Sequence, residues 1–109
     1  MAKANKIDKL TYKLVKSLTD EGIPVRRLIL YGSYAKDTQR SYSDIDIAVI
    51  SPAFEGKGIL KRQELLGEAL CSIGEPIEAL GYTPKECRKP PPLSFLSEIL
   101  STGKLIYKG

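Results

Sequence analysis

The sequence predicts a single domain of the α/β class (α+β), in which helices alternate with short strands. Three segments carry apolar residues at spacings of three and four, which is the period of an α-helix. Short continuous apolar runs bounded by glycine or proline lie between them and are typical of buried strands. A chain of 109 residues accommodates one hydrophobic core, so one domain spanning residues 1–109 is expected.

Helical periodicity places the first helix at about residues 5–21. Its apolar stripe consists of Ile7, Leu10, Leu14 and Leu18. Gly22 stops this helix, because glycine readily adopts the backbone conformation that ends helices. A second stripe, of lysines, runs directly beside the apolar one and consists of Lys6, Lys9, Lys13 and Lys16. Since lysine stems commonly flank a buried face while the charge stays in water, a solvated helix flank is favoured over a nucleic-acid surface.

Two strands are predicted next, at residues 28–31 and 44–50. The first is a continuous apolar run, which indicates a strand buried on both faces. Side chains alternate between faces along a strand. In the second strand Asp44 and Asp46 therefore project the same way, while the isoleucine that follows each aspartate projects into the core.

The second half of the chain continues the alternation. The expected elements are a helix over residues 59–73 that Gly74 ends, a strand over residues 77–82, a short capped turn over residues 83–86, a helix that resumes at Leu93 and ends at Gly103, and an edge strand over residues 104–107. The apolar side of the first of these helices consists of Ile59, Leu66, Leu70 and Ile73.

One motif stands out, in which Gly32 and Ser33 are followed by ten residues and then by Asp44, Ile45 and Asp46. Gly32 ends an apolar strand and allows a sharp turn there. Ser33 can cap a short helix, and the free backbone N–H groups behind such a cap form an anion site suited to a triphosphate. The glycine and serine therefore predict a phosphate-binding turn.

The two aspartates of the motif predict a metal site. Aspartate is poorly suited to strands, and two carboxylates on one face repel each other, so Asp44 and Asp46 require a compensating charge. Mg²⁺ is commonly held by one or two carboxylates together with substrate phosphates. A phosphate-binding turn beside a carboxylate pair points to nucleotidyl transfer.

With these residues in this order, the sequence resembles the DNA polymerase beta-like nucleotidyltransferase superfamily and, within it, the minimal nucleotidyltransferases (MNT antitoxin-like). The family signature of Gly-Ser, ten residues and Asp-x-Asp stands here without a gap, and the resemblance extends from the first helix through Tyr107. Lys36 and Asp37 depart from it, since many members carry arginine and glycine there. The resemblance implies a nucleotidyltransferase fold, with a small mixed β-sheet flanked by helices.

Members of this family carry a third carboxylate on a neighbouring strand. Glu78 is the candidate here, although many members have aspartate at that position. Glu75 is the competing assignment. It precedes Pro76 and is expected before the strand begins, at the rim of the site.

The resemblance implies a Mg²⁺-dependent enzyme with two metal ions. Asp44 and Asp46 would bridge both ions, and Glu78 would complete the site and accept the proton of the attacking hydroxyl. Gly32 and Ser33 would bind the phosphates. Two cations near the motif, Lys36 and Arg40, either neutralise phosphate charge or are solvated loop residues.

The resemblance also suggests the acceptor. Minimal nucleotidyltransferases commonly act with a helical protein of the HEPN class as a toxin–antitoxin pair, which implies transfer of AMP from ATP to a tyrosine of that partner within a homo- or hetero-oligomer. Phe54, Phe95 and Tyr107 are apolar candidates for an interface. Two alternatives stay open: a non-catalytic antitoxin that binds its partner, and a transferase that acts on RNA or a small molecule.

Composition narrows the class of protein. The chain has no apolar run of 18 residues and no signal-peptide pattern, so a cytoplasmic protein without membrane contact is expected. It has no histidine, which argues against a zinc site and favours chemistry by carboxylates and metal. Cys71 and Cys87 are expected to be reduced packing residues. The net charge of +4 leaves RNA open as an acceptor.

Overall fold

The computed structural model describes residues 5–32 and 44–109. The elements in these ranges are α1 (Asn5–Asp20), β1 (Arg27–Tyr31), β2 (Ile45–Ile50), the 3-10 turn η2 (Pro52–Phe54), α2 (Ile59–Leu70), β3 (Ile77–Tyr82), α3 (Pro84–Arg88), α4 (Phe95–Thr102) and β4 (Lys104–Lys108). None of the helices in these ranges has the length and apolar character needed to span a membrane.

The four strands form one mixed sheet in the order β3-β2-β1-β4. β1 runs antiparallel to both of its neighbours, whereas β2 and β3 are parallel. A parallel pair needs a crossover connection, and α2 provides it. The small mixed sheet flanked by helices is confirmed, and so is the edge position of the last strand.

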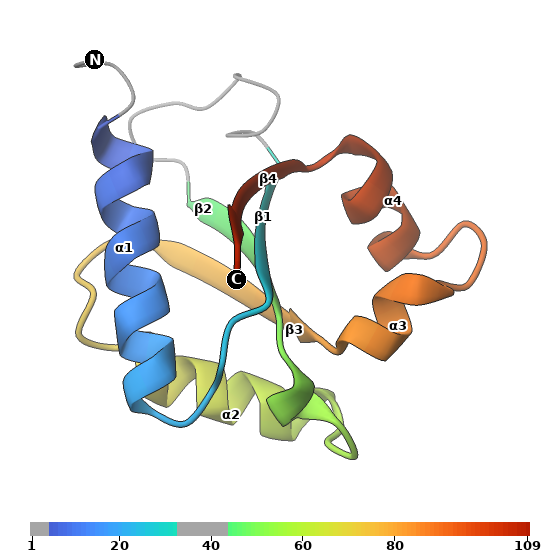
Figure 1. The fold of residues 1–109 in the computed structure, drawn as a ribbon, viewed down its shortest axis with the longest axis horizontal. Coiled ribbons are helices and arrows are strands. Elements are labelled where there is room, and N and C mark those ends of the chain that lie inside the picture. The colour runs from blue at the N-terminus through green and yellow to red at the C-terminus, as the bar shows by residue number, and fades with distance from the viewer. Residues whose placement is uncertain (1–4, 33–43) are drawn as a thin grey trace.

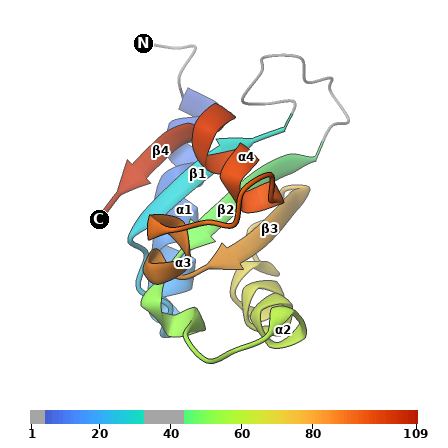
Figure 2. The same ribbon diagram turned by 90° about the vertical axis from the view of Figure 1, so that its right-hand side faces the viewer.

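Helices cover both faces of the sheet (Figure 1). On one face α1 and α2 pack against alternate residues of β1 and β2. The largest fully buried side chains of this cluster include Leu14, Leu18, Leu28, Ile45 and Ile47. On the other face α4 packs against Ile29, Ala48 and Ile50 through Ile99. We call these the α1/α2 face and the α4 face; Figure 2 shows the α4 face toward the viewer.

The ends of two helices differ from the sequence prediction. α2 ends at Leu70 rather than at residue 73, because the chain tightens into a turn in which the Ile73 N–H donates to the Leu70 carbonyl at 3.1 Å. The final helix begins at Phe95, where the Ser94 hydroxyl accepts from the Ser97 N–H at 3.0 Å. Leu93 lies outside the helix and is fully exposed, with a left-handed φ of 61°.

Three side chains depart from their expected surroundings, Ile59, Phe54 and Cys71, whereas Cys87 packs as expected. Ile59, expected on the apolar side of α2, is 78% exposed at the start of that helix. Phe54 is fully buried beneath β3 and cannot serve as an interface residue. Cys71 is exposed and is not a packing residue, whereas Cys87 is half-buried beside the α4-face cluster; both cysteines are free.

Candidate active site

Three strands bring a tyrosine and two carboxylates into one row across the sheet. In the ladder between β1 and β2, Tyr31 lies opposite Asp46. In the ladder between β2 and β3, Asp46 lies opposite Glu78. Residues opposite each other in adjacent strands point their side chains to the same face. We call Tyr31, Asp46 and Glu78 the cross-strand row; it lies on the α4 face.

The charge distribution in this row is unbalanced. Burial raises the pKa of the Asp46 carboxyl, and the nearby carboxylates of Glu78 and Asp44 raise it further. Asp44 is exposed and directly precedes β2, and Glu78 is also exposed. Adjacent carboxylates of like charge disfavour each other's ionised form. A cation bound at this site would therefore reduce the electrostatic repulsion among the carboxylates.

Gly32 shapes the site through the side chain that it lacks. Its backbone is left-handed, with φ +72°, and a Cβ built on it would overlap the Asp46 carboxylate. Glycine is required here for two reasons, the backbone conformation and the space that the carboxylate occupies. The structure thus places the first residue of the motif in contact range of the last.

Tyr31 also belongs to the site, although its sequence pattern predicts only a place in a strand. Burial raises the pKa of its hydroxyl group, and Asp46, Tyr82 and Glu78 add to the effect. Its ring packs edge-on against Phe95, with ring centroids 5.5 Å apart. The tyrosine therefore presents a neutral hydroxyl group near the carboxylates. Its position in the sequence, at the end of a strand and directly before Gly32, is the feature that could have indicated its place in the site.

The structure brings Gly32, Asp46 and Glu78 together, with Asp44 at the adjoining strand end. Glu75 lies in the turn before β3, is exposed, and is not among the groups that shift the pKa of Asp46. The geometry therefore favours Glu78 over Glu75 as the third carboxylate. The other predicted phosphate-site residues, Ser33, Lys36 and Arg40, lie outside the described residues.

The chemistry of the donors fits Mg²⁺, which prefers hard oxygen ligands. Within the part of the chain that the structure describes, no three acidic or cysteine side chains converge into a complete ligand set. Asp44 and Asp46 with Glu78 would hold such an ion only together with further ligands, as Mg²⁺ commonly uses waters and substrate phosphates.

The lysine stripe lies away from the carboxylates. Helix α1 packs on the α1/α2 face of the sheet, whereas the cross-strand row lies on the opposite face. Lys9, Lys13 and Lys16 are exposed, and Lys16 pairs with Asp20 at 3.2 Å. A nucleic acid bound along this stripe would not be directed into the carboxylate row.

Comparison with known proteins gives a consistent picture. Residues 11–95 match the family described as nucleotidyltransferase domain. A Methanocaldococcus jannaschii protein named as a candidate protein adenylyltransferase is 34% identical over 76 residues, which span 70% of this chain and 77% of that protein.

Solved structures share the fold. A candidate nucleotidyltransferase from Sulfolobus solfataricus superposes with a TM-score of 0.68 at 15% identity, covering 94% of this chain and 81% of that one. A toxin–antitoxin structure with AMP-PNP gives a TM-score of 0.60 at 26% identity, covering 90% of this chain and 73% of that one. A mutant of the toxin–antitoxin complex MntA–HpeT gives 0.57 at 23% identity, covering 90% and 72%.

Proposed function

The chain belongs to the nucleotidyltransferase domain family, and from that premise we propose that it transfers AMP from ATP to a hydroxyl side chain of a partner protein. Asp44, Asp46 and Glu78 are the proposed catalytic carboxylates. The observation that carries this proposal is the cross-strand row, which places Asp46 beside Glu78 and directly over Gly32. Nucleotidyl transfer needs such carboxylates next to a phosphate-binding turn.

The reaction is an in-line displacement at the α-phosphorus. The acceptor hydroxyl oxygen forms a new bond to that phosphorus, and the bond from phosphorus to the bridging oxygen of the β-phosphate breaks. The bond's electron pair leaves with pyrophosphate. The hydroxyl proton passes to the Glu78 carboxylate and from there to water, because Glu78 is the exposed end of the row.

Mg²⁺ is the proposed cofactor, and two ions are expected from the resemblance. When bound, they neutralise phosphate charge and lower the pKa of the attacking hydroxyl. The residues that would hold them are Asp44, Asp46 and Glu78. Gly32 is proposed to bind the triphosphate through its backbone N–H group. Ser33, Lys36 and Arg40 remain proposed phosphate ligands.

The partner is proposed to be a helical HEPN-class protein in a toxin–antitoxin pair. Support comes from the two toxin–antitoxin structures that share the fold and from the relative named as a candidate protein adenylyltransferase. AMP is proposed as the transferred group because one of those toxin–antitoxin structures contains AMP-PNP, an adenine nucleotide. A cytoplasmic location accords with this partnership.

The test is transfer of label from α-labelled ATP with Mg²⁺, with and without the protein encoded by the adjoining gene. Wild-type chain is compared with Asp44→Ala/Asp46→Ala. Label on the partner that disappears in the double variant supports the proposal. A stable complex without label would leave binding alone as the antitoxin mechanism, and label on RNA or a small molecule would identify a different acceptor.

A further inference from the structure

Strand β3 has one unpaired edge. Among the strands that the structure describes, it is the outermost on its side of the sheet and pairs only with β2. The N–H groups of Ile45 and Ser51, at either end of β2, donate to the carbonyls of Pro76 and Tyr82 at 2.8 and 2.9 Å. Because backbone groups alternate sides along a strand, the even-numbered residues of β3 face β2. The backbone N–H and C=O groups of the odd-numbered residues therefore face outward.

Arg62 closes one end of this edge. Its guanidinium group donates to the Gly81 carbonyl at 3.0 Å, while Glu86 accepts two hydrogen bonds from the same group at 2.9 and 3.0 Å. In residues 5–32 and 44–109, no hydrogen bond reaches the outward backbone groups of Ile77 or Ala79. The open stretch is thus short and ends at a fixed point.

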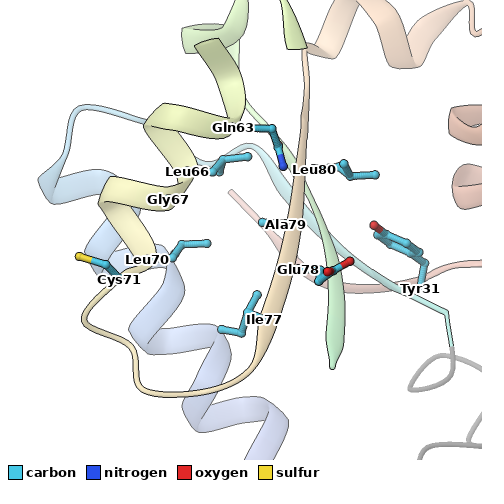
Figure 3. A pocket seen from close by; sticks show the side chains of 10 residues that line it. All are labelled: Tyr31, Gln63, Leu66, Gly67, Leu70, Cys71, Ile77, Glu78, Ala79 and Leu80. Carbon is cyan, nitrogen blue, oxygen red and sulfur yellow. The ribbon is translucent and has the colours of Figure 1, made fainter. Parts of the chain in front are cut away.

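A groove of about 400 Å³ runs along the open stretch. Four consecutive residues of β3 line it, Ile77, Glu78, Ala79 and Leu80. Since their side chains alternate between faces, all four can line one groove only if it follows the strand edge. Figure 3 shows these side chains on both sides of β3, with α2 beyond one side and Tyr31 beyond the other. The groove is therefore continuous with the cross-strand row.

Gly67 leaves space on the side of the groove that α2 forms, because it has no side chain. It lies inside α2, where glycine costs about 1 kcal/mol relative to alanine. A Cβ built on Gly67 meets no atom within 4 Å, so packing within the described chain does not require glycine. Gln63 and Cys71 stand one turn away on either side and are also exposed. The unexplained glycine leaves space beside the strand edge.

The two edge strands of the sheet, β4 and β3, differ in the features that discourage the addition of another strand. The β4 edge carries exposed Lys104 and Lys108, and its pairing with β1 contains a register shift; both features discourage the addition of another strand. Between Ile77 and Tyr82, β3 has no lysine, no proline and a regular register. The features that discourage strand addition at the β4 edge are therefore absent from β3, whose one charged residue is Glu78.

Glu78 is the charged side chain in the lining of the groove. Lys61 and Arg62 lie earlier on α2, and each pairs with a glutamate, Lys61 with Glu64 and Arg62 with Glu86. The other charges beside the groove are acidic. Glu68 adjoins Gly67 on α2, Glu75 precedes β3, and Glu78 lies within it; all three are exposed. The chain as a whole carries a net charge of +4, so this acidic edge is a local feature. It complements a segment that carries lysine or arginine.

We propose that the acceptor protein docks by adding a short, extended, basic segment to the free edge of β3, and that this segment carries the hydroxyl residue that receives AMP. This inference rests on the proposed function. The unpaired backbone groups of Ile77 and Ala79 would bond to the segment. A residue of the segment opposite Glu78 would extend the cross-strand row by one position, which presents its hydroxyl group on the same face as Asp46.

Amide hydrogen exchange, read residue by residue by NMR, tests the docking mode directly. The probe is the protein encoded by the adjoining gene. In the free chain the amides of Ile77 and Ala79 exchange quickly, whereas those of Leu80 and Tyr82 are protected by β2. Adding the probe is expected to slow exchange at these two outward amides by at least about tenfold. Unchanged exchange there, whether the probe binds elsewhere or not at all, overturns the proposal.

A matched pair of variants tests the groove in the transfer assay. Gly67→Leu fills the space beside the edge and is expected to raise the KM for the acceptor by at least about tenfold, with unchanged affinity for ATP. Gly67→Ala adds one methyl group in open space and is expected to behave as wild type. Equal KM values for Gly67→Leu and wild type contradict the docking mode.

The two proposals fail in different ways. If wild-type chain transfers no AMP but the outward amides become protected, the docking mode stands and the proposed reaction fails. If AMP is transferred while those amides and the Gly67→Leu variant show no effect, the reaction stands and the docking mode fails.

Discussion

At the scale of single residues, Gly32 combines a special backbone conformation with close contact to the proposed catalytic Asp46. Its left-handed φ and the Asp46 carboxylate above it both exclude a side chain. Gly22 offers a matched control, because it has a similar φ of +83° but nothing within 4 Å of a built Cβ. The two glycines separate backbone strain from disturbance of the site.

We expect Gly32→Ala and Gly22→Ala each to lower the free energy of unfolding by about 1–2 kcal/mol, the cost of a left-handed alanine. Only Gly32→Ala should also abolish AMP transfer, since only its methyl group displaces Asp46. Urea denaturation and the transfer assay measure the two effects. Equal activity in both variants would show that the contact between Gly32 and Asp46 has no role in catalysis.

The raised pKa of Asp46 distinguishes the two candidates for the third carboxylate. Glu78 contributes to the shift, so Glu78→Gln should lower the pKa of Asp46 toward its ordinary value. Glu75→Gln should leave it unchanged. A carbon-13 NMR titration of the Asp46 carboxyl, without metal, provides the measurement. A response to Glu75→Gln instead would reverse the assignment.

The raised pKa of Asp46 also affects the pH dependence of stability, and the difference in proton binding between the folded and unfolded states gives its sign. A carboxyl whose pKa is higher in the folded state than in the unfolded state binds its proton more tightly when folded. Its contribution to stability therefore falls as pH rises through its titration range. Glu78→Gln should raise the Tm at neutral pH while it lowers activity, and a lower Tm would contradict this.

At the scale of elements, Arg62 connects four segments. From α2 its guanidinium group donates to the carbonyl of Lys57 in the preceding loop at 2.8 Å, to the Gly81 carbonyl of β3, and to Glu86 of α3. Glu86 also accepts from the Thr83 N–H and closes the capping box of α3. The side chain of Arg62 is only 12% exposed. These contacts hold the end of β3 in place.

Lysine cannot reproduce this planar, bidentate arrangement, so Arg62→Lys should lower the free energy of unfolding by about 1–3 kcal/mol. Hydrogen bonding from Arg62 lowers the pKa of Glu86. Because that pKa is depressed in the folded state, its stabilising contribution is present at neutral pH and is lost as pH falls below about 4.5.

Glu86→Gln should therefore lower stability at pH 7 and weaken its acid dependence. Thermal unfolding of wild type and variant between pH 7 and pH 3 measures both. Parallel curves for the two proteins would contradict the role of this pair.

Local signals predicted the elements best where glycine or proline marked a boundary. Gly74 and Pro76 precede β3, and its predicted bounds agree with the observed strand at both ends. Prediction was wrong where apolar periodicity ran past the helix. Leu93 fits the stripe of α4, but Ser94 caps that helix one residue later. Ile59 fits the stripe of α2 yet is exposed, because periodicity alone does not show how far the neighbouring layer extends.

At the scale of the whole molecule, the cross-strand row depends on sheet register. The sequence predicted the Asp44 and Asp46 pair and a third carboxylate on a neighbouring strand. It could not place Tyr31, because the pairing of Tyr31 with Asp46 depends on the register between β1 and β2, which no local pattern fixes. The strand order that leaves one edge of β3 open was likewise not encoded in any local pattern.

The separation of the lysine stripe from the carboxylate row gives a prediction about the acceptor. Lys9→Ala/Lys13→Ala removes two exposed charges on α1, and AMP transfer to the protein partner should stay unchanged, because α1 lies on the opposite face of the sheet. Glu78→Gln serves as the inactive control. A large, salt-dependent loss of transfer in the lysine variant would contradict this prediction, because it would show that the exposed lysines of α1 contribute to acceptor binding.

The measurement that tests the central claim most directly uses ATP labelled at either the α- or the γ-phosphate, with Mg²⁺ and the partner protein. If the cross-strand row performs nucleotidyl transfer, the α-label appears on the partner and the γ-label is released as pyrophosphate, and Asp46→Asn abolishes both. Label from the γ-phosphate on the partner would show phosphoryl transfer, and no label from either position would show that the row does not catalyse this reaction.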